Sequence, residues 1–263
     1  MMIPILALMA AAAPIQPTLT PNGPWTVEFA DTLCILSRTY EVAGEPVRLL
    51  IKAPLVGTHY SIYVARKAGR TKVEARNDAF LVNADGVRFG PFPFDAYTNV
   101  QGMRIAHFSP EPEKYQLADS GGKLTVDLAD EGKFAFLIPN LPKALQTLEV
   151  CIKGLRKDFG IDQTVLDRIV TNEKYVRLPI YTEDYPYAAY SKGLQGNVAV
   201  LAFVGVDGRL SGCRVIESSG VPSLDEQTCR LLEERGRYEP ARDAQGTKMR
   251  SPIYTRVRWR VPS

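Results

Sequence analysis

Four cysteines and two histidines are the side chains of this sequence best suited to metal binding, nucleophilic attack or redox chemistry. They are Cys34, Cys151, Cys213, Cys229, His59 and His107. A zinc site usually draws ligands from closely spaced pairs such as Cys-x-x-Cys, and the sequence contains no such pair. We therefore expect no metal site and no cofactor.

Motifs for covalent or acid–base catalysis are also missing from the sequence. There is no Gly-x-Ser-x-Gly elbow, no His-Glu-x-x-His and no phosphate-binding Gly-rich loop. His59 and His107 fit packing or surface positions better than the role of a general base. Ser218-Ser219 fits a turn better than a nucleophile. The sequence therefore predicts a protein that is not an enzyme, and an enzyme of unidentified class is the weakest alternative.

The C-terminal end of the chain is basic. From residue 248 onward it carries five positive charges and no acidic residue, namely Lys248, Arg250, Arg256, Arg258 and Arg260. The formal charge of the whole chain is only +3, which does not indicate a nucleic-acid partner. Two interpretations stay open. The charges either protect a solvated edge strand from aggregation, or select an acidic peptide that adds to this edge by β-augmentation.

The elements before this basic segment follow from hydrophobic periodicity. Residues 197–206 and 209–218 alternate between apolar and polar positions, and Asp207-Gly208 between them suits a tight hairpin turn. Ser223 and Glu226 have the spacing of a capping box, which predicts a helix over 223–235. We expect Gly236 to end this helix.

The last segment alternates again, which predicts a final strand. One face carries Ile253, Thr255, Val257, Trp259 and Val261, and the other carries Tyr254, Arg256, Arg258 and Arg260. The order strand, strand, helix, strand predicts a small three-stranded antiparallel sheet with one covering helix.

The residues that join these elements resemble a known family. They are Tyr185-Pro186, Ala188-Ala189, Gly196, Asp207-Gly208-Arg209, Ser218-Ser219-Gly220, Leu224-Asp225, Arg237-Tyr238-Glu239-Pro240-Ala241 and Gly246. In this order and spacing, from Tyr185 to Val261, the segment resembles the C-terminal domain of the TonB family. In that family, the sheet and the region around the Tyr-Pro motif receive the Ton box, a short segment of an outer-membrane receptor.

The resemblance implies a protein-interaction module in TonB-dependent transmembrane transport. The peptide contacts expected from it are Tyr185, Pro186, Tyr254, Arg256, Arg258 and Arg260. A homodimer formed through the same edge strand is a further expectation. A full energy transducer of this family also has a membrane anchor and a Pro-rich spacer, whereas the 19 prolines here are scattered. The resemblance therefore leaves energy coupling open.

The N-terminus reads as an export signal. Residues 1–13 are apolar or small, carry no charge and are shorter than the roughly 20 residues that span a membrane. Ala10-Ala11-Ala12 supplies a small-residue cleavage pattern. We therefore expect a cleaved signal peptide and a periplasmic location in the bacterial cell envelope.

An exported chain allows its cysteines to pair, and four cysteines permit three pairings. Cys213 falls on the second hairpin strand and Cys229 on the following helix, which makes this a short and sensible span. Cys34 would then pair with Cys151. Buried free thiols are the alternative if the protein is not exported.

The region before the connector has a different pattern. Between residues 24 and 138, short β-rich runs alternate with Gly, Pro, Asp and Asn clusters, which predicts a sandwich or a partial barrel. From Asn140 the period changes to that of a helix of about four turns, with Cys151 on its apolar stripe. The predicted fold is α+β, with a β-rich domain at 24–158, a connector at 159–180 and a TonB-like domain at 181–263. An alternative function is that of a structural or ligand-binding envelope protein, with the β-rich domain as its functional part.

Overall fold

The computed structural model describes residues 17–57, 59–69, 75–99, 101–111 and 115–261. The predicted signal peptide at 1–13 lies outside them. The chain forms two compact units. One contains the chain up to Thr26 with Ser37–Ile51 and Ser61–Ala144, and the other contains Val27–Leu36, Lys52–Tyr60 and Leu145–Ser263. The domain boundaries expected from the sequence stay a prediction.

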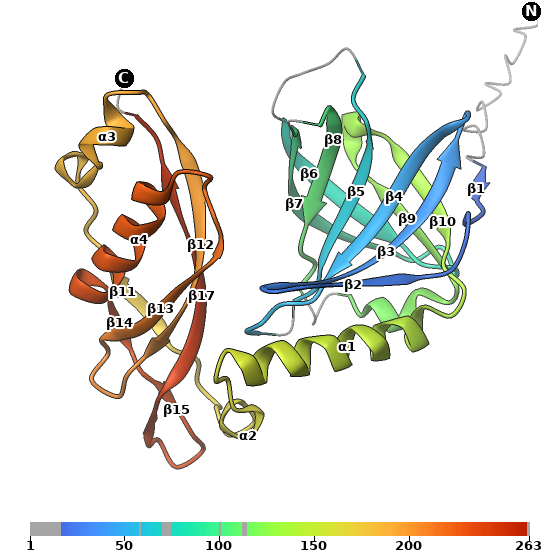
Figure 1. Ribbon diagram of the computed structural model, residues 1–263. Coiled ribbons are helices and arrows are strands. Elements are labelled where there is room, and N and C mark those ends of the chain that lie inside the picture. The colour runs from blue at the N-terminus through green and yellow to red at the C-terminus, as the bar shows by residue number, and fades with distance from the viewer. Residues whose placement is uncertain (1–16, 58, 70–74, 100, 112–114, 262–263) are drawn as a thin grey trace, which may run out of the picture. The chain divides into compact units, whose positions relative to one another are not determined.

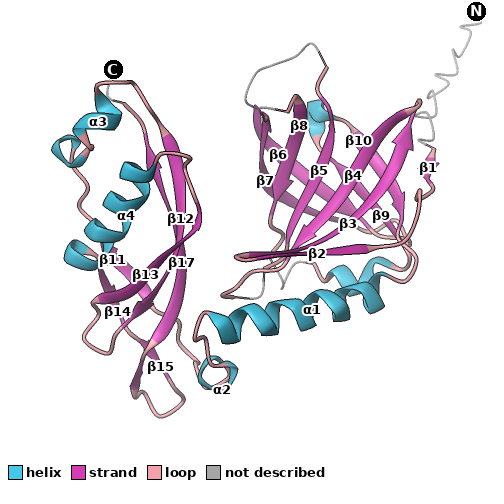
Figure 2. Ribbon diagram, viewed as in Figure 1, coloured by secondary structure: helices cyan, strands magenta, loops and turns pink. Residues whose placement is uncertain are grey.

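The N-terminal half of the chain forms one ten-stranded sheet in the order β1-β10-β9-β6-β7-β8-β5-β4-β3-β2. The strands are β1 (Thr18–Leu19), β2 (Thr26–Ala30), β3 (Leu33–Val42), β4 (Glu45–Lys52), β5 (Ser61–Lys67), β6 (Ala75–Val82), β7 (Arg88–Thr98), β8 (Met103–Phe108), β9 (Lys123–Asp127) and β10 (Lys133–Leu137). β1 is parallel to β10, whereas β9 is antiparallel to it. The sheet curls on itself (Figures 1 and 2), so the partial barrel is the correct one of the two predicted architectures.

The interior of the partial barrel is aromatic and aliphatic, because alternate residues of each strand face it. Its largest fully buried side chains are Tyr40, Phe92, Phe94, Phe136, Leu36, Leu49, Ile51, Ile62, Leu81, Leu124, Leu128 and Ile138. Two short 3-10 helices, Leu117–Ser120 and Ala129–Glu131, stand beside β9.

Strand β7 contains Gly90, Pro91 and Pro93, residue types that disfavour a strand. The pairing with the neighbouring strand β6 shifts register between Ala79 and Leu81, where Gly90 and Pro91 lie, whereas Pro93 pairs in register with Asp78. The two prolines are exposed, while Phe92 and Phe94 between and after them are buried. Burial of these aromatic side chains therefore outweighs the local preference against a strand.

Helix α1 (Leu141–Asp158) occupies the segment where the helical period was expected, and the short α2 (Gln163–Leu166) follows it. Its buried residues include Leu141, Leu148 and Cys151, which lie on the predicted apolar stripe. Cys151 forms a disulfide with Cys34 of β3, with 6.1 Å between their Cα atoms. None of the described helices is long and apolar enough to span a membrane.

The C-terminal segment has the predicted order of strand, strand, helix, strand. β12 (Gly196–Val204) lies between β13 (Leu210–Glu217) and β17 (Ser251–Trp259) and pairs with both in antiparallel fashion. Helix α4 (Pro222–Arg235) packs against this sheet. The smaller elements are β11 (Lys174–Arg177), a 3-10 turn (Thr182–Asp184), α3 (Tyr187–Tyr190), β14 (Arg237–Glu239), β15 (Ala241–Arg242) and β16 (Lys248–Met249).

The core of this domain lies between α4 and one face of the sheet. Its central strand contributes Val198, Val200, Ala202 and Val204, and the helix contributes Leu224, Leu231 and Leu232. Cys213 of β13 forms a disulfide with Cys229 of α4, with 5.4 Å between their Cα atoms. Both disulfides predicted from the sequence are thus confirmed.

The start of α4 differs from the expected capping box. Val221 is the N-cap residue, and no side chain caps the helix from that position. Instead, the Asp225 carboxylate accepts hydrogen bonds from the backbone N–H and hydroxyl of Ser219 and from the hydroxyl of Ser218. A carboxylate in the first turn is also favoured by the helix dipole.

The end of α4 also differs in its mechanism. Gly236 does follow the helix, but its φ of −59° is not left-handed. A Cβ atom there would lie 2.5 Å from the Leu232 carbonyl oxygen and 2.7 Å from Leu210 Cδ1. This position therefore needs glycine because of close packing, and not because of its backbone conformation.

Candidate peptide-binding edge

Strand β17 forms one edge of the three-stranded sheet (Figure 1). It pairs with β12 without any shift of register, from Ser251 opposite Val204 to Trp259 opposite Gly196. Within the described part of the chain, no strand is paired with its other side. A long and regular edge of this kind presents its backbone N–H and C=O groups to any extended segment that approaches.

The opposite edge, β13, is far less available. Its pairing with β12 shifts register twice, and Gly212 has a left-handed φ of +66°. The backbone N–H of Cys213 donates to Glu233 Oε1 at 2.9 Å, and the Cys213 side chain is bonded to α4. Irregularity and side-chain cover are common means of blocking an edge, so β17 is the better template for another strand.

The side chains of β17 alternate as the sequence predicted. Ile253, Val257 and Trp259 are buried against the helix, whereas Tyr254, Arg256 and Arg258 are exposed. The polar residues therefore share the face of the sheet that α4 does not cover.

Two of these exposed residues are held in place by β13. The hydroxyl of Tyr254 donates to Glu217 Oε1 at 2.9 Å, and Arg256 Nη2 donates to Glu217 Oε2 at 2.8 Å. Burial, and after it the charge of Glu217, raises the pKa of the Tyr254 hydroxyl, which therefore stays protonated. These contacts fix Tyr254 and Arg256 before any partner binds.

Arg258 differs from its neighbours because it makes no hydrogen bond or ion pair with the described residues. Arg260 donates to the carbonyl oxygen of Trp259 at 2.9 Å. The guanidinium of Arg250 lies 3.6 Å from the ring centroid of Phe203. Of the basic residues predicted as peptide contacts, Arg258 is thus the one best able to meet a new carboxylate.

The C-terminal segment matches the family model described as Gram-negative bacterial TonB protein C-terminal, over residues 182–261. Residues 182–261 are a TonB C-terminal domain. The segment is also similar to the TonB C-terminal domain of Pseudomonas aeruginosa, whose solution structure is known. The identity is 23%, the match covers 35% of this chain and 89% of that one, and the TM-score is 0.29. A search of curated proteins found no match.

TonB C-terminal domains are protein-interaction modules. Within the described residues, no group of three or more His, Cys, Asp or Glu side chains is arranged to hold a metal ion. His107 stacks on Tyr63, with 5.2 Å between the ring centroids.

The Tyr185 side chain belongs to the core of the TonB C-terminal domain. It is 9% exposed, and its hydroxyl donates to the Leu194 carbonyl oxygen at 2.5 Å. Its ring meets that of Trp259 edge-on, with centroids 5.2 Å apart. Pro186 follows at the start of α3. Tyr185 therefore supports the end of β17 from within the core, and its contact with a peptide stays a prediction, as does that of Pro186.

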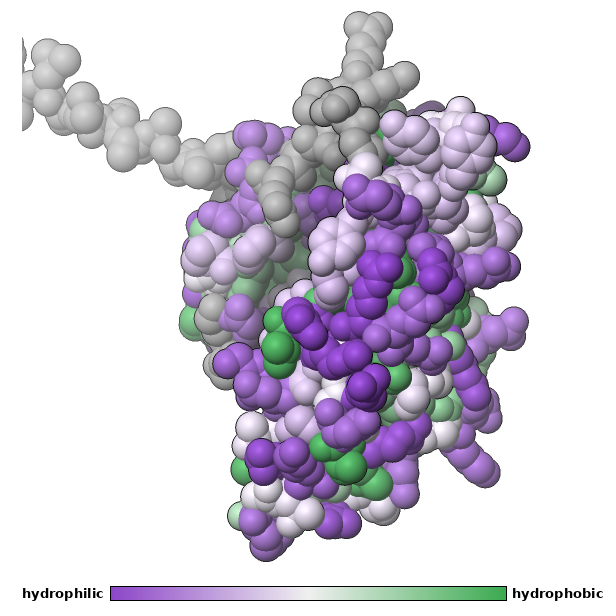
Figure 3. Space-filling model, turned by 90° about the vertical axis from the view of Figure 1, so that its left-hand side faces the viewer, coloured by the Kyte–Doolittle hydropathy of each residue, from purple (hydrophilic) through white to green (hydrophobic). Residues whose placement is uncertain are grey.

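Exposed tyrosines that were not predicted from the sequence surround this motif in the TonB C-terminal domain. Tyr187 is 83% exposed, and Tyr181 and Tyr190 are also exposed. Figure 3 shows one face of the molecule, on which hydrophilic residues dominate and hydrophobic residues form small, separate areas. A high local density of tyrosine was visible in the sequence and could have marked these residues.

Asp184 is a buried acidic residue, only 8% exposed. Its Oδ2 atom accepts hydrogen bonds from Arg235 at 2.7 Å and from the Tyr181 backbone N–H at 2.8 Å. Burial alone would raise the pKa of Asp184, but these bonds and the charge of Arg235 outweigh it and lower the pKa. The pair ties the segment before α3 to the end of α4, and no local sequence signal indicates it.

Proposed function

We propose that this protein acts in the periplasm and that its TonB C-terminal domain binds an extended peptide by β-augmentation along the free edge of β17. The observation that carries the proposal is the contrast between the two edges of the sheet. β17 is regular over its whole length, whereas β13 is shifted in register and tied to α4. Main-chain hydrogen bonds to β17 would supply affinity, and side chains beside the edge would supply selectivity.

The charge beside this edge favours an acidic peptide. Arg256 is hydrogen-bonded to Glu217. Within the described structure, Arg258 is therefore the exposed cation of β17 that is free to bind a carboxylate of the partner. The Ton box of an outer-membrane receptor is the partner we propose, with a role in TonB-dependent transport. A second copy of the chain would compete for the same edge as a homodimer.

A periplasmic location is consistent with the two disulfides, because disulfides persist in oxidising compartments. The apolar N-terminal segment supports export as well.

The first experiment titrates the full-length protein with Ton-box peptides that contain acidic residues and follows backbone amide chemical shifts. We expect the largest changes along Tyr254–Trp259. Two further peptides carry N-methyl groups on alternate residues, one in each register. Because only one register points its N–H groups at β17, we expect one methylated peptide to lose binding and the other to retain it.

The variant Arg258→Gln tests the charge, and Arg214→Gln on the other edge strand is the matched control. We expect Arg258→Gln to weaken an acidic peptide about fivefold, as suits an exposed ion pair, and to leave its Asn-substituted analogue unchanged. Arg214→Gln should change neither. Shifts confined to the N-terminal residues, or equal loss with both methylated peptides, would overturn the proposal.

A further inference from the structure

A pocket of about 300 Å³ opens in the partial barrel, between the start of β4, the end of β5 and the start of β10. Its lining residues include Val42, Val47, Phe134, Glu45, Arg66 and Lys67. We propose that this pocket binds a small amphiphilic anion, with a carboxylate head and a short hydrocarbon body. The proposal is independent of the β17 edge and goes beyond peptide binding. The volume lies at the lower end of the usual range for ligand sites, about 300–1,000 Å³, so the ligand must be small.

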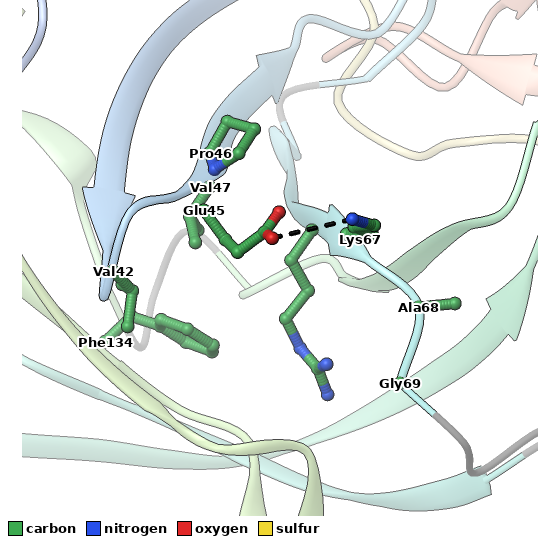
Figure 4. A pocket seen from close by; sticks show the side chains of 9 residues that line it. Val42, Glu45, Pro46, Val47, Lys67, Ala68, Gly69 and Phe134 are labelled. Atoms are coloured by element: carbon green, nitrogen blue, oxygen red, sulfur yellow. Dashed lines mark hydrogen bonds and ion pairs between the residues drawn. The ribbon is translucent and has the colours of Figure 1, made fainter.

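The apolar part of the ligand would lie against Val42, Val47 and Phe134. Val47 and Phe134 are almost fully buried, whereas Val42 is 37% exposed at the mouth. Figure 4 shows Phe134 beside Val42 on one side of the pocket and Lys67 on the other. One side is thus apolar and the other cationic, which is the arrangement that an amphiphile requires.

Arg66 is the polar anchor of the site. Its Nη2 atom donates to Glu131 Oε2 at 3.1 Å and to the Glu131 carbonyl oxygen at 3.3 Å. Its Nε and Nη1 atoms make no hydrogen bond with the described residues. The guanidinium is therefore held in position through its Nη2 atom. Its Nε and Nη1 donors remain for a carboxylate, which a planar guanidinium binds well.

Arg66 is not the sole partner of Glu131, because the Glu131 carboxylate also pairs with Arg104. Arg104 is 3% exposed, and its Nε atom lies 3.1 Å from both carboxylate oxygens of Glu131. Hydrogen bonds from Arg104 lower the pKa of Glu131, which stays ionised. The Nη1 atom of Arg104 is buried without a partner in the described structure. One carboxylate thus serves two guanidinium groups, and positive charge is in excess behind the pocket.

The mouth of the pocket carries a weaker ion pair. Lys67 Nζ lies 3.5 Å from Glu45 Oε1, and both side chains are largely exposed (Figure 4). An exposed pair of this kind contributes little, so an incoming anion can compete for Lys67. Arg66, Arg104 and Lys67 carry three positive charges, whereas Glu45 and Glu131 carry two negative charges. The excess of positive charge favours an anionic ligand over a cationic one.

The test compares decanoate, decanol and decyltrimethylammonium as probes of the full-length protein, by calorimetry and by chemical shifts of valine methyl groups. We expect saturable binding of decanoate, at least tenfold tighter than that of decanol, because charge-assisted hydrogen bonds are made only by the carboxylate. Decyltrimethylammonium should bind more weakly than decanol. The methyl signals of Val42 and Val47 should shift with decanoate.

Five variants locate the site. Arg66→Gln should weaken decanoate about tenfold and leave decanol unchanged. Lys67→Gln is the milder charge variant, because this side chain is exposed, and it should weaken decanoate about threefold; Lys143→Gln, an exposed lysine outside the pocket, is its control. Val42→Trp should fill the mouth and abolish binding of both probes, whereas Val87→Trp, at an exposed position elsewhere, should not.

Thermal melting of each variant establishes that it is folded. Equal affinity for decanoate and decanol would overturn the proposal, and so would binding that Val42→Trp leaves intact. Loss of peptide binding at β17 would not affect this result, because none of these substitutions touches that strand.

Discussion

A single buried hydroxyl joins the last strand of the TonB C-terminal domain to its helix. The indole N–H of Trp259 donates to Thr228 Oγ1 at 2.8 Å, and that hydroxyl donates in turn to the Leu224 carbonyl oxygen. Thr228 is fully buried, and Trp259 is 3% exposed. One oxygen atom therefore satisfies a side-chain donor in a place that water does not reach.

Thr228→Val should destabilise the domain, because valine has the shape of threonine but no acceptor for the Trp259 N–H. We expect a loss of about 1–3 kcal/mol in the free energy of unfolding, the cost of a buried unpaired polar group. Urea denaturation followed by tryptophan fluorescence measures it. Thr228→Ser keeps the hydroxyl and should be the more stable variant; a valine variant at least as stable as the serine one would contradict this account.

At the scale of elements, the hairpin between β12 and β13 is fixed by the close approach of β14. Gly208 in the turn has φ of +79°, and a Cβ atom there would lie 2.2 Å from the Tyr238 carbonyl oxygen. The Tyr238 backbone N–H donates to the Gly208 carbonyl oxygen at 2.9 Å. The turn therefore needs glycine for two reasons, its left-handed conformation and the space beside it.

Two glycine substitutions separate these reasons. Gly220 has nearly the same φ, +80°, but no atom lies within 4 Å of a Cβ placed there. Gly220→Ala should therefore lower the free energy of unfolding only by the cost of a left-handed alanine, about 1–2 kcal/mol. Gly208→Ala adds a clash with the backbone and should cost about 3 kcal/mol or more. Equal losses in thermal or urea unfolding would show that the approach of Tyr238 imposes no constraint.

At the scale of the whole molecule, the two disulfides each join a strand to a helix. Cys34–Cys151 closes a long loop, with a sequence separation of 117, and Cys213–Cys229 a short one, with a separation of 16. A long closed loop removes more conformational entropy from the unfolded chain than a short one. Both bridges require an oxidising environment during folding, which connects the fold to the proposed location.

Peptide mapping of the protein from cell envelopes, without reductant, tests this connection. We expect two linked peptide pairs, Cys34 with Cys151 and Cys213 with Cys229, and no labelling by a thiol reagent in denaturant. Labelling should appear at all four cysteines after reduction, which serves as the internal control. Free thiols in the untreated protein would contradict periplasmic export.

Those features of this protein that depend on neighbouring residues could be predicted from the sequence alone. The hairpin at Asp207-Gly208, the helix α4 and the alternation along β17 follow from local periodicity and turn chemistry, and the structure confirms them. Both disulfides also followed, since each cysteine lay on a recognisable element. The family resemblance rested on the residues that join these elements, because the order and spacing of turns can be read directly from the sequence.

Contacts between residues that are far apart in the chain could not be predicted from the sequence and emerge only in the folded protein. Strand β7 forms despite its prolines because the burial of Phe92 and Phe94 offsets the low strand propensity of proline. Tyr185 lies in the core because Trp259 packs on its ring, and Asp184 is buried because Arg235 pairs with it. Arg66 and Arg104 likewise share Glu131, which lies far from Arg66 in the chain. Periodicity reports the environment of each residue, but the choice of partner depends on how distant segments pack together.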